Sequence, residues 1–159
     1  MIHEQATSIP NKIPDNFLDT LMQGFSLGDC IGFKEADQES IYTVGYQLYQ
    51  SGKIQDAAKV FRFLGLMDPL NRKSLFALAA CEKALGNYRA AIDLFSVAAL
   101  LDIQDQQAFF EIGVYYMSLE EFDHAHSAFS TVAFFAGKPG GQTALKQRAK
   151  KMLEVCEMN

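Results

Sequence analysis

His124 and His126 form a His-x-His pair, and imidazole is the side chain most often found as a metal ligand in proteins. The segment around them has a helical pattern, and residues two apart on a helix point about 200° away from each other. The pair is therefore poorly placed to share one metal ion, and we expect it on a surface or between helices. Cys81 follows Ala79 and Ala80 in an apolar segment, with no histidine in a matching place nearby. We expect a buried thiol there and not a nucleophile.

Two adjacent carboxylates, Glu120 and Glu121, are the remaining candidates for acid–base chemistry. Both precede a predicted helix, and carboxylates at that end favour the positive pole of the helix dipole. The sequence contains no glycine-rich phosphate loop and no Gly-x-Ser-x-Gly motif. We therefore expect neither an enzyme nor a metal or cofactor site.

The composition of the chain excludes other classes of function. Its 159 residues carry a net charge of −5 and no run of lysine or arginine, which argues against a nucleic-acid partner. Three cysteines without a Cys-x-x-Cys pair indicate neither a disulfide framework nor a zinc site, and fit a reducing cytoplasm. The start of the chain lacks the pattern of a signal peptide, and no stretch of roughly 18 apolar residues is present. We expect a cytoplasmic protein that is not inserted in a membrane.

A period of 34 residues runs through most of the chain. It relates Gly52 to Gly86, and it relates three further sets: Gly45, Ala79 and Gly113; Ala57, Ala91 and Ala125; and Phe61, Phe95 and Phe129. The small residues suit close helix packing, and the phenylalanines suit a core. Self-similarity at this period is typical of tetratricopeptide repeats. The sequence therefore predicts an all-α tetratricopeptide-repeat solenoid of three helix-turn-helix repeats, with a short N-terminal helix and a C-terminal capping helix.

The repeats divide the chain into segments. The expected repeats are residues 38–71, 72–105 and 106–139, and with a C-terminal helix at 142–157 they form one unit, 38–157. Their expected helices are 39–50 and 54–66, 74–85 and 88–101, and 108–119 and 122–135. Residues 1–13 are expected to be a mobile tail, and 14–37 a short helix at 16–23 with a connection. That connection is too apolar for a solvated linker, so it either folds back on the first repeat or meets a second subunit: Phe25, Leu27, Ile31 and Phe33.

The inner surface of such an array is lined by the first helix of each pair. The positions not used for core packing, three or four residues apart on one face, are Tyr42, Tyr46 and Tyr49; Phe76, Ala80 and Lys83; and Phe110, Val114 and Met117. This groove is aromatic and apolar with one charge, so it suits an extended apolar peptide better than an acidic tail. The alternative is that these side chains simply pack between neighbouring helices.

Several segments together carry a resemblance to a known family. They are a short amphipathic helix (NKIPDNFLDTLMQG), a glycine-containing connection (FSLGDCIGF), a tyrosine-rich first repeat with a YQSGK turn (IYTVGYQLYQSGKIQDAAKVFRFLGLMDP) and a second repeat (LAACEKALGNYRAAIDLFSVAALLDI). With the degenerate third repeat and the last helix, most of the chain resembles the class II chaperones of type III secretion.

The resemblance implies a cytoplasmic chaperone that holds hydrophobic translocator proteins, two clients in the family, soluble and apart before export. It implies an extended Pro-x-Leu-x-x-Pro-like client segment in the concave groove, with Lys83 available to a peptide carbonyl. It also implies a homodimer in the absence of client, through the N-terminal region: Phe17, Leu18, Leu21, Met22 and Phe25. The alternative function is a generic tetratricopeptide adaptor that joins two folded proteins.

Overall fold

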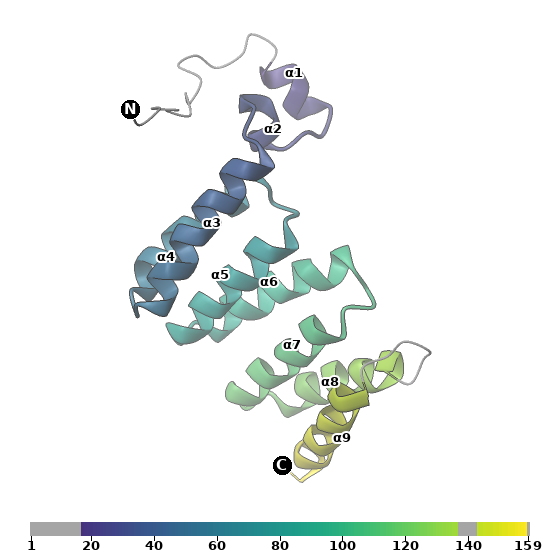
Figure 1. The fold of residues 1–159 in the computed structure, drawn as a ribbon. Coiled ribbons are helices and arrows are strands. Elements are labelled where there is room, and N and C mark those ends of the chain that lie inside the picture. Colours follow the sequence, from purple (N-terminus) through teal and green to yellow (C-terminus); the bar gives the residue numbers. More distant parts are fainter. Residues whose placement is uncertain (1–16, 137–142, 159) are drawn as a thin grey trace.

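The computed structural model describes residues 17–136 and 143–158, and within them the regular structure is helical. The helices are α1 (Phe17–Met22), α2 (Leu27–Ile31), α3 (Glu35–Gln50), α4 (Ile54–Met67), α5 (Arg72–Ala84), α6 (Tyr88–Leu101), α7 (Gln106–Ser118), α8 (Phe122–Ala136) and α9 (Thr143–Glu157). Three hairpins, α3–α4, α5–α6 and α7–α8, stack in chain order, and α9 packs on α8 and α7 (Figure 1). The predicted all-α array of helix pairs is confirmed. The expected tail, 1–13, lies outside the described residues.

The turns inside the three hairpins have the same backbone design. Gly52 and Gly86 each have a φ of 79°, and Glu120 takes the equivalent place with a φ of 59°. In each turn the next N–H reaches back to a carbonyl of the preceding helix, as Lys53 N does to Leu48 O at 2.9 Å. This left-handed ending satisfies a carbonyl that the helix leaves open, and glycine adopts it without strain.

The core repeats with the same period. A Cβ atom added to Gly45 would lie 2.8 Å from Cε1 of Phe61, and one added to Gly113 would lie 2.7 Å from Cε1 of Phe129. These distances are too short for a real side chain, so glycine lets the two helices of a pair approach. The predicted core alanines have no exposed surface: Ala57, Ala91 and Ala125.

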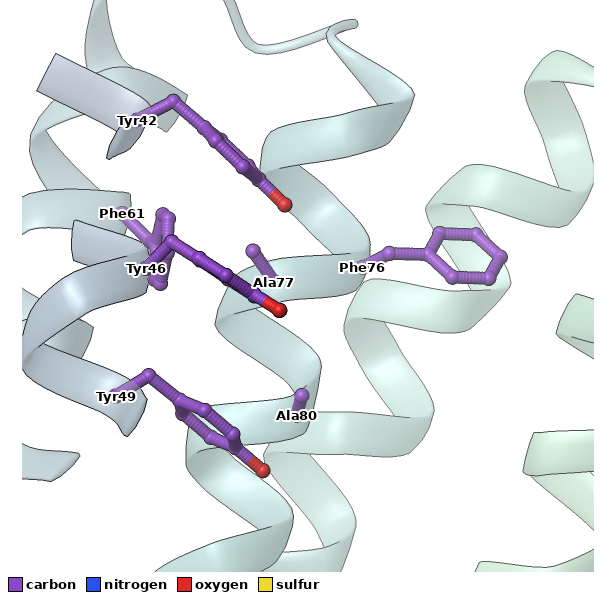
Figure 2. Close-up of a pocket in the computed structure, with 7 residues that line it drawn as sticks. All are labelled: Tyr42, Tyr46, Tyr49, Phe61, Phe76, Ala77 and Ala80. Carbon is purple, nitrogen blue, oxygen red and sulfur yellow. The ribbon is translucent and has the colours of Figure 1, made fainter. Parts of the chain in front are cut away.

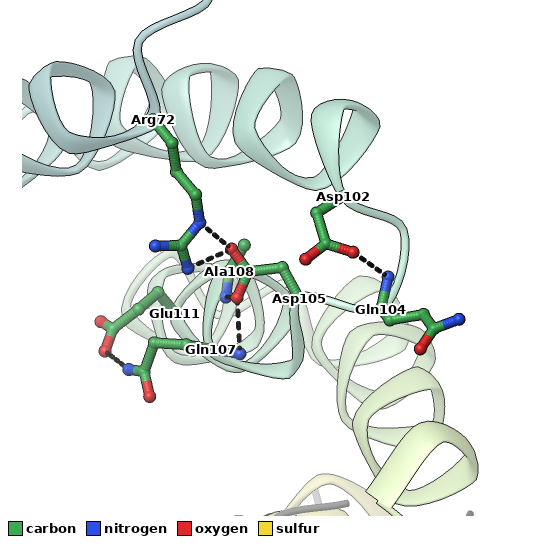
Figure 3. A network of polar contacts seen from close by, with 7 residues as sticks. All are labelled: Arg72, Asp102, Gln104, Asp105, Gln107, Ala108 and Glu111. Carbon is green, nitrogen blue, oxygen red and sulfur yellow. Dashed lines mark hydrogen bonds and ion pairs between the residues drawn. The ribbon is translucent and has the colours of Figure 1, made fainter. Parts of the chain in front are cut away.

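Polar contacts at the junctions fix one repeat on the next. Nε and Nη2 of Arg72 both donate to Oδ2 of Asp105, and Oδ1 of Asp105 accepts from the backbone N–H of Gln107 and of Ala108, each at 3.1 Å (Figure 3). Asp105 therefore caps α7 and ties its start to the start of α5. Because Asp105 and Asn71 act as caps, α7 and α5 each begin two residues earlier than the sequence pattern suggested.

A second junction contact is buried. Glu82 on α5 accepts hydrogen bonds from Arg62 on α4 and from Asn87, and its side chain is only 6% exposed. Burial acts to raise the pKa of Glu82, but the hydrogen bonds from Asn87 and Arg62 outweigh it, so the pKa lies below its usual value.

Part of the N-terminal connection, at Gly28 and Phe33, folds back on the first repeat, which was one of the two alternatives expected for it. Ser26 and Asp29 form a reciprocal capping box that starts α2. A Cβ on Gly28 would lie 2.7 Å from the carbonyl oxygen of Met67, and the ring of Phe33 meets that of Phe63 edge-on at 6.0 Å. α3 then starts at Glu35, four residues before the expected position.

Within residues 17–136 and 143–158, no helix combines the length and the apolar character needed to cross a membrane.

Candidate functional site

A cavity of about 220 Å³ opens between α3 and α5. Three tyrosines line it from α3, and their hydroxyl groups point toward α5 (Figure 2). The small side chains of Ala77 and Ala80 on α5 leave the space that the rings face. The complete lining is Tyr42, Tyr46, Tyr49, Phe61, Phe76, Ala77 and Ala80. The cavity therefore has aromatic walls and carries three hydroxyl groups, with no charged side chain in its lining.

The tyrosines share one face of α3 because they are four and three residues apart. Tyr46 is 49% exposed and is the most open of the rings. The ring of Tyr42 lies 5.2 Å from that of Phe61, and Nζ of Lys73 lies 4.0 Å from its centroid. Burial raises the pKa of the Tyr42 hydroxyl, partly offset by Lys73. Tyr42 is thus a fixed wall of the cavity, and Tyr46 is its accessible part.

Phe76 connects the cavity to the second repeat. Its ring is directed away from the tyrosines (Figure 2) and meets Phe95 edge-on at 4.8 Å. The guanidinium carbon of Arg72 lies 4.2 Å from the Phe76 centroid. Phe76 therefore serves both the cavity and the core, because it lines the one and packs on the other.

The residues predicted for the groove divide into three groups. Five of them line the cavity: Tyr42, Tyr46, Tyr49, Phe76 and Ala80. Lys83 is exposed further along α5, with Nζ 5.8 Å from the ring centroid of Tyr115. The residues of the third repeat lie outside the cavity: Phe110, Val114 and Met117.

Phe110 is a correction to the sequence-based expectation of an open groove position. Its side chain is 2% exposed, packs against Phe129, and has the guanidinium carbon of Arg148 on α9 at 4.4 Å from the ring centroid. Val114 and Met117 are partly buried against the same cluster. Phe110, Val114 and Met117 therefore pack between helices, which was the alternative expectation for the groove residues.

Two lining residues were missed. Phe61 was assigned to the core alone, although its ring also forms part of the cavity wall. Ala77 follows Phe76 and lies one turn before Ala80, so the stripe that faces α3 could have been found from the spacing of small residues on α5.

The residues considered for chemistry lie elsewhere. His124 is exposed, with Nδ1 3.4 Å from Glu121, and Nε2 of His126 lies 3.8 Å from Glu157. Across the part of the chain that the structure describes, no three histidine, cysteine or acidic side chains gather as metal ligands would. Cys81 is fully buried, as predicted, and burial raises its pKa to about 11.

The N-terminal residues predicted for a dimer contact are partly visible. Leu21, Met22 and Phe25 are 36%, 86% and 51% exposed. Phe17 and Leu18 belong to α1, but their side chains lie outside what the structure describes. The three described side chains form no part of the repeat core.

Comparisons with known proteins agree with the repeat pattern. Residues 39–71 match the model of the tetratricopeptide repeat family. The low calcium response locus protein H of Yersinia pseudotuberculosis is 32% identical over 121 residues, which cover 76% of this chain and 71% of that protein.

Solved structures are also similar. PcrH from Pseudomonas aeruginosa, in complex with the chaperone binding region of PopD, is 33% identical with a TM-score of 0.71, covering 80% of this chain and 96% of PcrH. The type III secretion translocator chaperone SycD of Yersinia enterocolitica, in complex with a peptide of the translocator YopD, is 28% identical with a TM-score of 0.71, covering 79% of this chain and 95% of SycD. SycD has also been solved as an alternative dimer.

Proposed function

This chain belongs to the class II chaperones of type III secretion, and from that membership we propose that it holds hydrophobic translocator proteins soluble before their export. It takes an extended apolar segment of the client, of the Pro-x-Leu-x-x-Pro type, into the groove between its first helices. We expect two clients, each bound before secretion in the bacterial cytoplasm. The protein acts by binding alone, without a cofactor and without a nucleic-acid partner.

The observation that carries this proposal is the cavity between α3 and α5. Tyr42, Tyr46 and Tyr49 offer large rings with few rotatable bonds, so ordering them on binding costs little entropy. Their hydroxyl groups can donate to the carbonyls of an extended peptide, which has no hydrogen bonds of its own. A proline-containing segment has already lost much of its freedom, which further lowers the entropy that binding removes.

We also propose that the protein is a homodimer when no client is bound. Met22 and Phe25 expose apolar surface at the N-terminal end, beside Leu21, and exposed groups of this kind mark association sites. The relative SycD forms dimers, which supports association in this family. Light scattering of Leu21→Asp tests the contact, and we expect its mass to shift toward that of a monomer. A mass equal to that of the unchanged protein would show that the N-terminal helix does not form the dimer contact.

Co-expression tests the chaperone function. The probes are proteins with long apolar segments encoded next to this gene, produced with and without this chain. We expect each to be soluble only in its presence. No gain in solubility for any of them would remove the chaperone function and leave the adaptor alternative.

Variants in the cavity test the binding site. Tyr46→Asp places a charge where an apolar side chain would bind, and we expect it to abolish the rescue. Because Tyr46 is half exposed, the fold should tolerate the change, which circular dichroism checks. Gln47→Asp is the matched control, since it adds the same charge to the next, exposed position of α3. Rescue by Tyr46→Asp at the level of Gln47→Asp would show that the cavity is not the site.

A further inference from the structure

The 34-residue period places a second subsite next to the cavity, with a different character. Shifting the lining by one repeat takes Tyr49 to Lys83 and Ala77 to Glu111. Because equivalent positions of stacked repeats face the same side, Lys83 on α5 and Glu111 on α7 lie on the inner side of the array, past the end of the cavity. Lys83 is exposed there and Glu111 is partly exposed. The groove is therefore aromatic at one end and charged further along.

Glu111 is held in a fixed orientation by its own helix. One carboxylate oxygen accepts from Nε2 of Gln107 at 2.7 Å (Figure 3), and the other accepts from the hydroxyl of Tyr115 at 3.0 Å. Glu111 is partly buried, and both of these donors are neutral. The carboxylate is thus oriented by its neighbours, while its negative charge is balanced by no cation in an ion pair within the described residues.

Tyr115 brings Glu111 near Lys83 on α5. Nζ of Lys83 on α5 lies 5.8 Å from the Tyr115 ring centroid. Burial raises the pKa of the Tyr115 hydroxyl, with smaller contributions from Glu111 and from Tyr49 on α3. Tyr49 also lines the aromatic cavity. Tyr115 is only 2% exposed, so it holds the carboxylate of Glu111 from the core side of α7.

We propose that Glu111 is a specificity-determining residue of the groove, which accepts hydrogen bonds from a lysine or arginine side chain of the client beside its apolar segment. The inference rests on the proposed function, since it assigns a second contact to the same bound segment. A fixed carboxylate gains most from a cationic donor, because charge-assisted hydrogen bonds are the strong ones. Lys83, an exposed and flexible ammonium group, is a weaker anchor because binding must first order it.

Dimensions set the position of that cation in the client. α6 packs on both α5 and α7 and separates them, so the distance from the cavity to Glu111 is at least one interhelical spacing of roughly 8–10 Å. An extended chain advances about 3.3 Å per residue, so the cation of the client lies at least about three residues from the side chain that fills the cavity.

Fluorescence anisotropy with labelled synthetic peptides tests the assignment. Each peptide carries the core Pro-Ala-Leu-Ala-Ala-Pro and either lysine or glutamate three or four residues to one side of it, with both sides tried. We expect the lysine peptide to bind about five- to tenfold more tightly than the glutamate peptide on one side. Glu111→Gln keeps the shape and removes the charge; its amide oxygen can still accept from Gln107, and its NH2 group can donate to the Tyr115 hydroxyl. It should reduce the preference to about twofold or less. Asp93→Asn, which removes an exposed carboxylate from α6, is the matched control and should keep the full preference.

The outcomes separate the inference from the proposed function. If no peptide binds the unchanged protein, the groove function fails and the role of Glu111 fails with it. A second outcome is that the peptides bind the unchanged protein and not Tyr46→Asp, but the lysine peptide binds no more tightly than the glutamate peptide. In that case the role of Glu111 alone is overturned. A preference that persists in Glu111→Gln, or a preference for glutamate, has the same meaning.

Discussion

Tyr42 in the first repeat and Phe110 in the third occupy equivalent positions of α3 and α7. Each ring packs on the phenylalanine of its paired second helix, Phe61 or Phe129. Tyr42 nevertheless lines an open cavity, whereas Phe110 is 2% exposed. An aromatic side chain in the same place of the repeat thus lines a cavity in one case and belongs to the core in the other.

The helix that follows in the stack makes the difference. Beyond α3 lies α5, which presents Ala77 and Ala80 and leaves room beside the tyrosines. Beyond α7 lies α9, which is packed against α7 and α8 and places Arg148 over the ring of Phe110. Accessibility in this solenoid is therefore a property of the contact between neighbouring repeats, and a single repeat does not determine it.

Truncating the two kinds of ring gives the largest expected contrast. Phe110→Ala removes a buried ring from the cluster under α9, and we expect it to lower the free energy of unfolding by about 3–5 kcal/mol. Tyr46→Ala removes an exposed ring, and its effect should stay within about 0.5 kcal/mol. Urea denaturation followed by circular dichroism measures both. Equal losses in the two variants would mean that the first and third repeats do not differ in the way described.

The repeat core was predictable from the sequence because its causes are local. A small residue and a phenylalanine recur at the same spacing in each unit, as Gly45 and Phe61 do in the first. Close packing of a helix hairpin requires a small residue opposite a large one. The face of α3 that carries Tyr42 and Tyr46 followed from helical periodicity, since only one face remains after the core is filled.

The missing parts depend on contacts between segments. The burial of Phe110 requires α9 to lie across it, and no pattern within residues 106–139 contains that information. α7 starts early because Asp105 caps it, and the same carboxylate forms an ion pair with Arg72 at the start of α5. Glu111 was absent from the predicted groove because it lies next to, and not on, the stripe of α7 that carries Phe110, Val114 and Met117.

The two junctions between repeats offer a second contrast, which depends on pH. Glu82 at the first junction has a side chain that is 6% exposed, whereas Glu121, paired with Arg89 at the second, is 26% exposed. Breaking charged hydrogen bonds at the buried site should cost about 1.5–3 kcal/mol in Glu82→Gln at pH 7. The partly exposed pair should cost below about 1 kcal/mol in Glu121→Gln.

The pKa of Glu82 gives this effect a direction. Its value in the folded protein is below the ordinary 4.5, so its contribution to stability is complete above pH 4.5 and disappears as the pH falls through the folded pKa. The gap between the unchanged protein and Glu82→Gln in urea denaturation should therefore be largest near pH 7 and shrink below pH 4.5. A gap that stays constant across this window would contradict the contribution of the charge.

The turns of the repeats give the smallest expected contrast. Gly52 in the first repeat and Gly86 in the second have positive φ values at no steric cost, but Glu120 in the third holds a φ of 59° with a side chain present. Relief of that strain outweighs the extra freedom that glycine has in the unfolded chain, so Glu120→Gly should stabilise the protein by about 0.5–1 kcal/mol. Gly86→Glu makes the reverse exchange in an equivalent turn, where an added Cβ meets nothing within 4 Å, and should destabilise by a similar amount. Thermal denaturation of both variants measures the pair of effects. If Glu120→Gly is less stable than the original protein, the glutamate side chain makes a contact that outweighs the strain of its positive φ. The third turn would then differ from the other two in its side-chain contacts as well.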